Sequence, residues 1–204
     1  MELEVDTQQR ILDSASELIH ARSYADVGVA EICEHAEVKK GSFYHFFRSK
    51  RDLTLAVLDT YYTRMKRDLM DKAFSAGLPP LQRLERFGQL MYNVQKTSVA
   101  LTGRMVGCPF GNLAIELSTQ DEQIRLKLAD IFSELCTEFN RTLDEAVNIG
   151  DMEDVDTTAT AEAMVAYFEG VMMMAKTQND PEVLNQLLPS LTAIRIYPAD
   201  AVQL

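Results

Sequence analysis

The sequence predicts an all-α protein, from two features of its residue pattern. Apolar residues recur at the i, i+3, i+4, i+7 spacing of amphipathic helices, as in residues 11–19 (ILDSASELI), and this spacing returns along most of the chain. Segments rich in Gly, Pro or acidic residues separate the periodic stretches, at 77–80, 103–111 and 150–156. We expect about nine helices, in a three-helix N-terminal domain of residues 1–53 and a larger helical domain of residues 54–204.

The bulk composition is that of an ordinary helical protein without a membrane anchor. The chain has 204 residues, of which 47% are hydrophobic and 25% charged, enough for one sizeable core or two small ones. No apolar run approaches the roughly 18 residues that a membrane span requires. The N-terminus, MELEVDTQQR, is acidic and polar, unlike a signal sequence. We therefore expect a cytoplasmic protein with no membrane partner.

The cysteines and histidines do not predict a metal site, a disulfide framework or a cofactor. The three cysteines form no CxxC pair and leave an odd thiol: Cys33, Cys108 and Cys136. No two of the three histidines have metal-ligand spacing on a shared face. The loop 103–111 (GRMVGCPFG) is rich in Gly, but it lacks the Lys and the hydroxyl residue of a phosphate-binding P-loop.

The N-terminal part predicts a helix-turn-helix. Residues 7–22 form a first helix, capped by Asp6 or Thr7, and the acidic residues before it are expected to be a solvated tail. Residues 30–36 (AEICEHA) have helical spacing, and the three residues after them are too few for more than a turn. A second short helix follows the turn, and two short helices joined in this way form a helix-turn-helix.

The segment after the turn concentrates positive charge in a chain whose formal net charge is −11. Residues 38–53 (VKKGSFYHFFRSKRDL) contain five Lys and Arg residues and one acid, Asp52. Such a local excess in an acidic protein indicates an anionic partner, of which phosphate is the first candidate. Gly41 permits close approach of the backbone, while Phe43, Phe46 and Phe47 supply an apolar side. This is the pattern of a recognition helix.

Residues 23–53 (SYADVGVAEICEHAEVKKGSFYHFFRSKRDL) closely resemble the DNA-binding motif of TetR-family transcriptional regulators, including the KGSFYHFF and SK..L blocks. The resemblance implies a ligand-responsive regulator, most often a repressor. Such a regulator binds a pseudo-palindromic double-stranded DNA operator as a homodimer, with its recognition helices about 34–36 Å apart. Together the charge pattern and the resemblance predict eight DNA-contacting residues: Lys39, Lys40, Gly41, Ser42, Tyr44, His45, Arg48 and Lys50.

Four positions depart from the family pattern. Val27 and Gly28 stand where relatives usually carry hydroxyl residues that cap the second helix and touch a phosphate; here Gly28 can cap, with Glu31 completing half a capping box. Glu37 replaces the turn glycine, which is unfavourable if the position needs a positive φ. Lys39 replaces a Ser cap before the recognition helix. These changes affect individual contacts more than the fold.

The remaining chain predicts further helices. Ser49 and Asp52 form a capping-box variant at the start of a long helix to about residue 76, and this helix N-terminus together with Lys50 makes a second phosphate site. Other helices are expected at residues 81–102, 112–118, 121–148, 157–178 and 181–195. The last two are more apolar than one small domain can cover, which predicts a homodimer interface formed as a four-helix bundle.

The C-terminal domain is expected to bind a small-molecule effector. Polar residues on otherwise packed helices are candidate effector contacts: Tyr92, Gln95, Arg104, Asn112, Glu116 and Tyr167. Residues 107–118 (GCPFGNLAIELS) resemble a segment of those TetR-like regulators that respond to small reactive electrophiles or unsaturated acids. Cys108, in a loop at a helix start where a thiol pKa can be lowered, is a candidate sensor. The alternative is a small buried residue in a tight turn.

Two other functions compete with a DNA-binding regulator. One is a helical adaptor that has kept the fold and lost DNA binding, for which Val27, Gly28 and Glu37 are the arguments. The other is an enzyme with Cys108 as nucleophile. It would need a nearby base, and all three histidines lie in the N-terminal part of the sequence. We therefore predict that the chain is not an enzyme.

Overall fold

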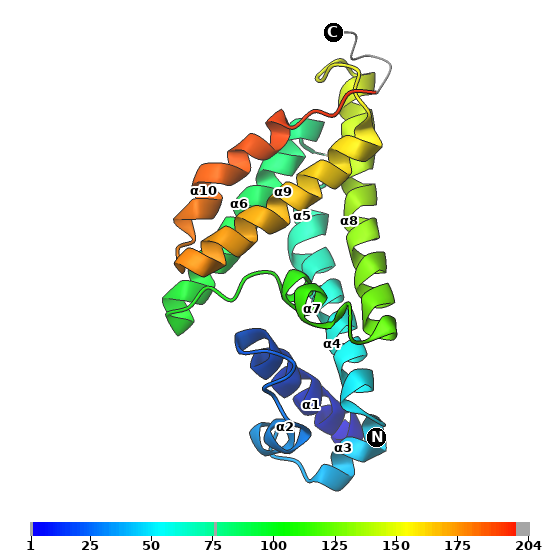
Figure 1. The fold of residues 1–204 in the computed structure, drawn as a ribbon, viewed down its shortest axis with the longest axis vertical. Helices are drawn as coiled ribbons and strands as arrows, with labels where there is room; N and C mark the ends of the chain where they lie inside the picture. The colour runs from blue at the N-terminus through cyan, green and yellow to red at the C-terminus, as the bar shows by residue number, and fades with distance from the viewer. Residues whose placement is uncertain (1, 76, 199–204) are drawn as a thin grey trace. The chain divides into compact units, whose positions relative to one another are not determined.

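The computed structural model describes residues 2–75 and 77–198, with side chains from residue 6 onward, and confirms the all-α fold class (Figure 1). The elements in chain order are α1 (Glu2–Ala21), α2 (Val29–His35), α3 (Lys40–Phe46), α4 (Lys50–Met65), η1 (Lys66–Met70), α5 (Asp71–Ala73), α6 (Pro80–Thr102), α7 (Pro109–Leu117), α8 (Glu122–Asn148), α9 (Thr157–Gln178), α10 (Glu182–Leu187) and η2 (Leu188–Ala193). Because α4, η1 and α5 are continuous, as are α10 and η2, these elements form nine helical rods in the described part of the chain.

The chain forms two compact units. The first unit comprises Met1–Arg64 and Pro109–Ala129, and the second comprises Met65–Cys108 and Asp130–Leu204. Helix α7 and the start of α8 therefore belong to the same unit as α1, α2 and α3. The expected domain boundary between residues 53 and 54 separates the DNA-binding part from the effector-binding and dimerisation part, and it stays a prediction.

Two helix starts and two helix types differ from those expected. Helix α1 begins at Glu2, so the expected cap at Asp6 or Thr7 is wrong, and the residues before Thr7 that were expected to be a tail are helical from Glu2 onward. Helix α7 begins at Pro109, where the missing N–H of proline is no loss. The long helix from Lys50 contains the π-helical turn η1. The last helix changes to the 3-10 form η2 at Leu188, because Pro189 cannot donate an α-helical hydrogen bond.

The core of the first unit joins α1, α2, α3 and α4. The side chains of Ile11, Ile32, Phe43, Leu53 and Val57 are fully buried there. Each comes from an apolar position of an amphipathic helix, so burial of these faces fixes how the short helices α2 and α3 pack on α1. Since α3 spans only seven residues, it depends on this packing for its stability.

The core of the second unit contains a cluster of four phenylalanines, three from the helices α6, α8 and α9 and one, Phe74, directly after α5. The Phe87 ring on α6 lies 5.3 Å from the Phe139 ring of α8, 5.2 Å from the Phe168 ring of α9 and 6.0 Å from the Phe74 ring. Helices α6, α9 and α10 lie side by side (Figure 1). At the edge of this core the buried Arg83 guanidinium donates to the Glu145 carboxylate at 2.7 and 3.0 Å.

No helix among the residues described is both long enough and apolar enough to cross a membrane.

Candidate DNA interface and effector segment

The turn between α2 and α3 is held by a residue outside the motif. Glu37 adopts a φ of 53°, in the left-handed region. A residue with a Cβ is unfavourable in this conformation, so the expected cost of replacing the turn glycine by Glu37 is present. The Arg10 guanidinium of α1 donates to the carbonyl oxygens of Ala36 at 2.5 Å and Glu37 at 3.2 Å. These two bonds tie the turn to α1, so Arg10 supports a backbone conformation that the residue at 37 does not itself favour.

The N-cap residues of α2 and α3 make no capping hydrogen bond with their side chains. Gly28 is the N-cap of α2, as expected, with an extended backbone. The predicted half capping box is wrong, because the Glu31 carboxylate pairs with the Arg22 guanidinium instead, and two opposite charges make the stronger hydrogen bond. Lys39 is the N-cap of α3 and makes no capping hydrogen bond with its side chain.

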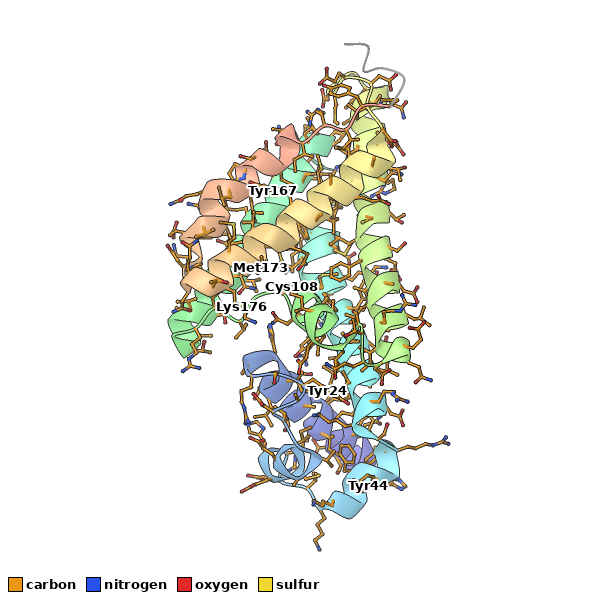
Figure 2. All side chains as sticks on the ribbon, viewed as in Figure 1. Tyr24, Tyr44, Cys108, Tyr167, Met173 and Lys176 are labelled. Carbon is orange, nitrogen blue, oxygen red and sulfur yellow. The ribbon has the colours of Figure 1, made fainter. Side chains whose placement is uncertain are left out.

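Helix α3 buries one face and exposes the other. Phe43 is fully buried and Phe47 is 5% exposed, whereas Tyr44 between them is 57% exposed (Figure 2). Most predicted DNA contacts lie on this exposed surface: Lys39, Lys40, Gly41, Tyr44, His45 and Arg48. Ser42 and Lys50 are half-buried. The structure therefore presents backbone, hydroxyl and cationic groups together, as contact with a phosphate backbone and a base edge requires.

Lys50 is the best-defined of these cations. Ser49 Oγ accepts a hydrogen bond from the Asp52 N–H at 3.1 Å, which confirms this half of the expected cap and fixes the first turn of α4. The Lys50 ammonium donates to the carbonyl oxygen of Tyr24 and lies 3.9 Å from the centre of the Tyr24 ring. Burial lowers the pKa of Lys50, and the nearby Glu116 carboxylate opposes this shift. Lys50 thus stands at the start of α4 in a fixed position.

Helix α7, the α8 cap and α8 make four contacts with residues 1–64 of the first unit. Glu116 of α7 accepts hydrogen bonds from the N–H groups of Tyr24 and Ala25 at 2.9 and 2.7 Å. Asp121, which caps α8 by accepting from the Ile124 N–H at 3.2 Å, pairs with the Arg51 guanidinium. Further along, the Lys127 ammonium lies 2.5 Å from the Asp59 carboxylate, and the rings of Tyr61 and Phe110 meet edge to face.

The predicted effector residues divide between the two units. Glu116 and Asn112 lie on α7 in the first unit, where Glu116 is occupied by the backbone contacts just described. The other five belong to the second unit: Cys108, Tyr92, Gln95, Arg104 and Tyr167. Their assignment as effector contacts stays a prediction.

Cys108 lies directly before α7, at a helix start as expected. Its side chain is buried, as in the alternative of a small buried residue. Its thiol hydrogen-bonds to the carboxyl group of Glu169 on α9. Burial raises the pKa of Glu169, while this bond to Cys108 lowers it by less. Gln95 of α6 donates to the carbonyl oxygen of Gly107, the residue before Cys108, at 3.3 Å. The Gln95 amide oxygen is buried and has no hydrogen-bond partner among the described residues.

The two predicted tyrosines of the second unit hold helices together. The Tyr167 hydroxyl donates to the carbonyl oxygen of Leu187 at 2.9 Å and so joins α9 to α10. The Tyr92 hydroxyl donates to Glu182 at 2.5 Å and accepts from Lys96 at 2.9 Å, which joins α6 to α10. Arg104 is exposed in the loop after α6. Both hydroxyl groups are used within the fold.

Sequence reasoning missed Glu169, Tyr24 and Arg10 as members of these sites. Glu169 had a detectable signal, since it is the one charged residue in the otherwise apolar run 168–174 (FEGVMMM) of α9. Tyr24 and Arg10 act on residues 26 positions away, through main-chain carbonyl groups, and such contacts leave no local pattern. Among the described residues, no group of three or more His, Cys, Asp or Glu side chains could hold a metal ion.

A helix-turn-helix whose second helix carries an exposed polar and cationic face defines a DNA-binding protein. The family follows from two matches: residues 11–57 match the family described as bacterial regulatory proteins, tetR family, and residues 80–191 match the tetracyclin repressor-like C-terminal domain. The chain belongs to the TetR family of DNA-binding transcriptional regulators, and the resemblance of residues 23–53 is confirmed.

Individual relatives agree with this family over most of the chain. The transcriptional regulator AcuR of Cereibacter sphaeroides is 34% identical over 179 residues, covering 87% of this chain and 80% of AcuR. The HTH-type transcriptional repressor DhaR of Mycobacterium sp. (strain GP1) is 27% identical over 182 residues, covering 89% and 88%. The crystal structure of regulatory protein TetR from Rhodobacter sphaeroides is similar with a TM-score of 0.81 and 32% identity, covering 92% of this chain and 98% of that one.

Proposed function

We propose that the chain is a cytoplasmic, homodimeric repressor that binds a pseudo-palindromic operator and leaves it when a small molecule binds residues of the second unit. The observation that carries this proposal is the exposed face of α3, with Tyr44 and the surrounding cations outside and Phe43 and Phe47 buried behind them. Similarity to DhaR, which is named a repressor, supports the sign of regulation.

Two exposed side chains on α9 support the dimer. Met173 (labelled in Figure 2) is 56% exposed and Met174 is 46% exposed, whereas Met164 and Met172 of the same helix are buried. Together with α10, this helix supplies the surface that the sequence predicts for a four-helix bundle with a second copy. A dimer also places two α3 helices on one duplex, about 34–36 Å apart, which a pseudo-palindromic operator requires.

The proposal is tested by selecting duplexes from random DNA with the purified protein. The selected sequence should show two inverted half-sites, and binding should exceed that of random competitor at moderate ionic strength by about a thousandfold or more. Recovery of no preferred sequence would favour the helical adaptor instead. Sedimentation of the unbound protein as a dimer is expected.

For the effector, we propose a small electrophile or unsaturated acid that reacts with or lies against Cys108. The resemblance of residues 107–118 supports this class, and the half-buried Glu169 carboxyl, which bonds to the thiol, supplies a polar group for orienting it. Incubation with acrylate or iodoacetamide, followed by intact-mass and DNA-release measurements, tests it. Cys108→Ser should abolish the response and Cys136→Ser should preserve it. Repeated turnover of an activated ester by the wild type, lost in Cys108→Ser, would favour the enzyme.

A further inference from the structure

Glu116 occupies an unfavourable place for an acidic residue. It is the penultimate residue of α7, and the C-terminal end of a helix carries partial negative charge that repels a carboxylate. Both of its oxygens are nevertheless used: one accepts from the Tyr24 N–H at 2.9 Å, the other from the Ala25 N–H at 2.7 Å. Two successive amide groups aimed at one carboxylate form a small anion-binding site in the loop between α1 and α2.

Tyr24 connects this carboxylate to a predicted DNA contact. Its N–H donates to Glu116, while its carbonyl oxygen accepts from the Lys50 ammonium and its ring lies 3.9 Å from the same ammonium. All of these residues belong to the first unit. The Tyr24 peptide groups are therefore held from both sides, by α7 through the N–H and by the start of α4 through the carbonyl.

A series of contacts runs from Glu116 through Tyr24 to Lys50. These contacts fix the position of the Lys50 ammonium before DNA binds. A free lysine side chain samples many rotamers, and ordering it on a phosphate reduces affinity. Here one of its three donors is used by Tyr24, which leaves two for a phosphate oxygen and solvent. Resting on the proposed role of the first unit in operator binding, we propose that Glu116 is a positioning residue, which acts through Tyr24 to hold the Lys50 ammonium ready for a DNA phosphate.

This role differs from that expected of Glu116 as an effector contact, and it gives α7 an indirect part in DNA binding, through Tyr24 and Lys50. Glu116 belongs to residues 107–118, the segment that resembles a sensing segment of other regulators. Its side chain also holds the loop between α1 and α2 in place. A displacement of α7 by one hydrogen-bond length would free the Tyr24 and Ala25 N–H groups. Lys50 would then lose its fixed partner, and operator affinity would fall without any change in α3.

The test is a double-mutant cycle on the selected duplex, measured by filter binding at several salt concentrations. Glu116→Gln keeps the shape but leaves one of the two N–H groups facing an amide NH2. We expect it to weaken binding by about tenfold, the loss of one charge-assisted hydrogen bond. In a Lys50→Ala background the same change should alter binding by less than about twofold, since coupled residues are not additive.

The matched control is Glu122→Gln on α8, also in the first unit. It removes the same charge from an exposed carboxylate that pairs with Arg125 of its own helix, in contacts of 2.6 and 2.7 Å. Because removing a negative charge reduces repulsion from DNA, this control should bind equally well or slightly better than wild type. A purely electrostatic effect of Glu116→Gln would have that same sign.

A second variant keeps the test decisive if Glu116→Gln destabilises the loop. Tyr24→Leu retains both backbone contacts but removes the ring beneath the ammonium, and we expect two- to fivefold weaker binding that also vanishes in the Lys50→Ala background. Equal binding by Glu116→Gln and Glu122→Gln, or simple addition of either effect to that of Lys50→Ala, would overturn the positioning role alone. If the wild type prefers no duplex, the proposed function fails and this inference fails with it.

Discussion

Phenylalanines are used in two ways in the two units. In the first unit Phe43 and Phe47 are buried on one side of α3, and the other side of that helix carries Tyr44 and the predicted DNA contacts. In the second unit Phe87 and Phe139 are fully enclosed by other rings and helices. The first arrangement exists to present a surface, the second to close a core. Changes to the two should therefore separate DNA binding from stability.

The largest effect is expected from Phe87→Ala. This ring contacts three others, at centroid distances of 5.2 to 6.0 Å, and is 1% exposed. Its removal should lower the free energy of unfolding by about 3–5 kcal/mol through lost burial and the cavity left behind. Denaturant unfolding with Tyr44→Ala as comparison measures this, since the exposed tyrosine should cost less than about 0.5 kcal/mol. A similar loss of unfolding free energy in Phe87→Ala and Tyr44→Ala would mean that the second-unit ring cluster and the exposed face of α3 do not differ in this way.

The next largest effect is expected on DNA affinity, not on stability, when Lys50 is replaced. Lys50→Ala should weaken binding to all duplexes and reduce the slope of log K against log salt by about one unit, as expected for one lost phosphate contact. Filter-binding titrations over a range of salt concentrations measure it. Lys72→Ala, which removes an exposed lysine of α5 in the second unit, should leave the slope unchanged. An unchanged slope for Lys50→Ala would remove Lys50 from the DNA interface.

A smaller, pH-dependent effect is expected at Glu169. Burial raises the pKa of this carboxyl above its ordinary value of 4.5, so the folded state favours the neutral form. The stability that this gives is complete below pH 4.5 and is lost as the pH rises through the folded-state pKa. Glu169→Gln, which stays neutral, should therefore raise the melting temperature at pH 8 and change it little at pH 4. A gain of the same size at both pH values would show that ionisation is not the cause.

The same contrast between the units explains what the sequence could predict. Helix positions followed from apolar spacing, and the motif in 23–53 identified both α3 and its exposed residues. The contacts of Glu116 with Tyr24, and of Cys108 with Glu169, could not be foreseen, because each joins residues more than 60 positions apart. The 3-10 form of η2 could have been predicted from Pro189, whose missing N–H breaks the helical pattern.

One departure from the family pattern was foreseen and has a definite consequence for stability. Glu37 has a φ of 53°, a conformation that a residue with a Cβ adopts at a cost of roughly 1–2 kcal/mol and glycine adopts freely. Glu37→Gly should therefore stabilise the protein by about 0.5–1 kcal/mol, after the greater freedom of glycine in the unfolded chain is deducted. The ion pair with Arg10 that it removes is exposed, at 3.6 Å, and contributes little.

Glu34→Gly is the matched control, because it removes the same carboxylate from an exposed position inside α2. There glycine should destabilise by about 1 kcal/mol, so thermal unfolding should show opposite shifts for two substitutions only three residues apart. Loss of stability in both variants would mean that the turn at 37 depends on the Glu37 side chain. Since Arg10 already binds the carbonyl groups of the turn, we expect Glu37→Gly to leave the direction of α3, and therefore operator affinity, unchanged.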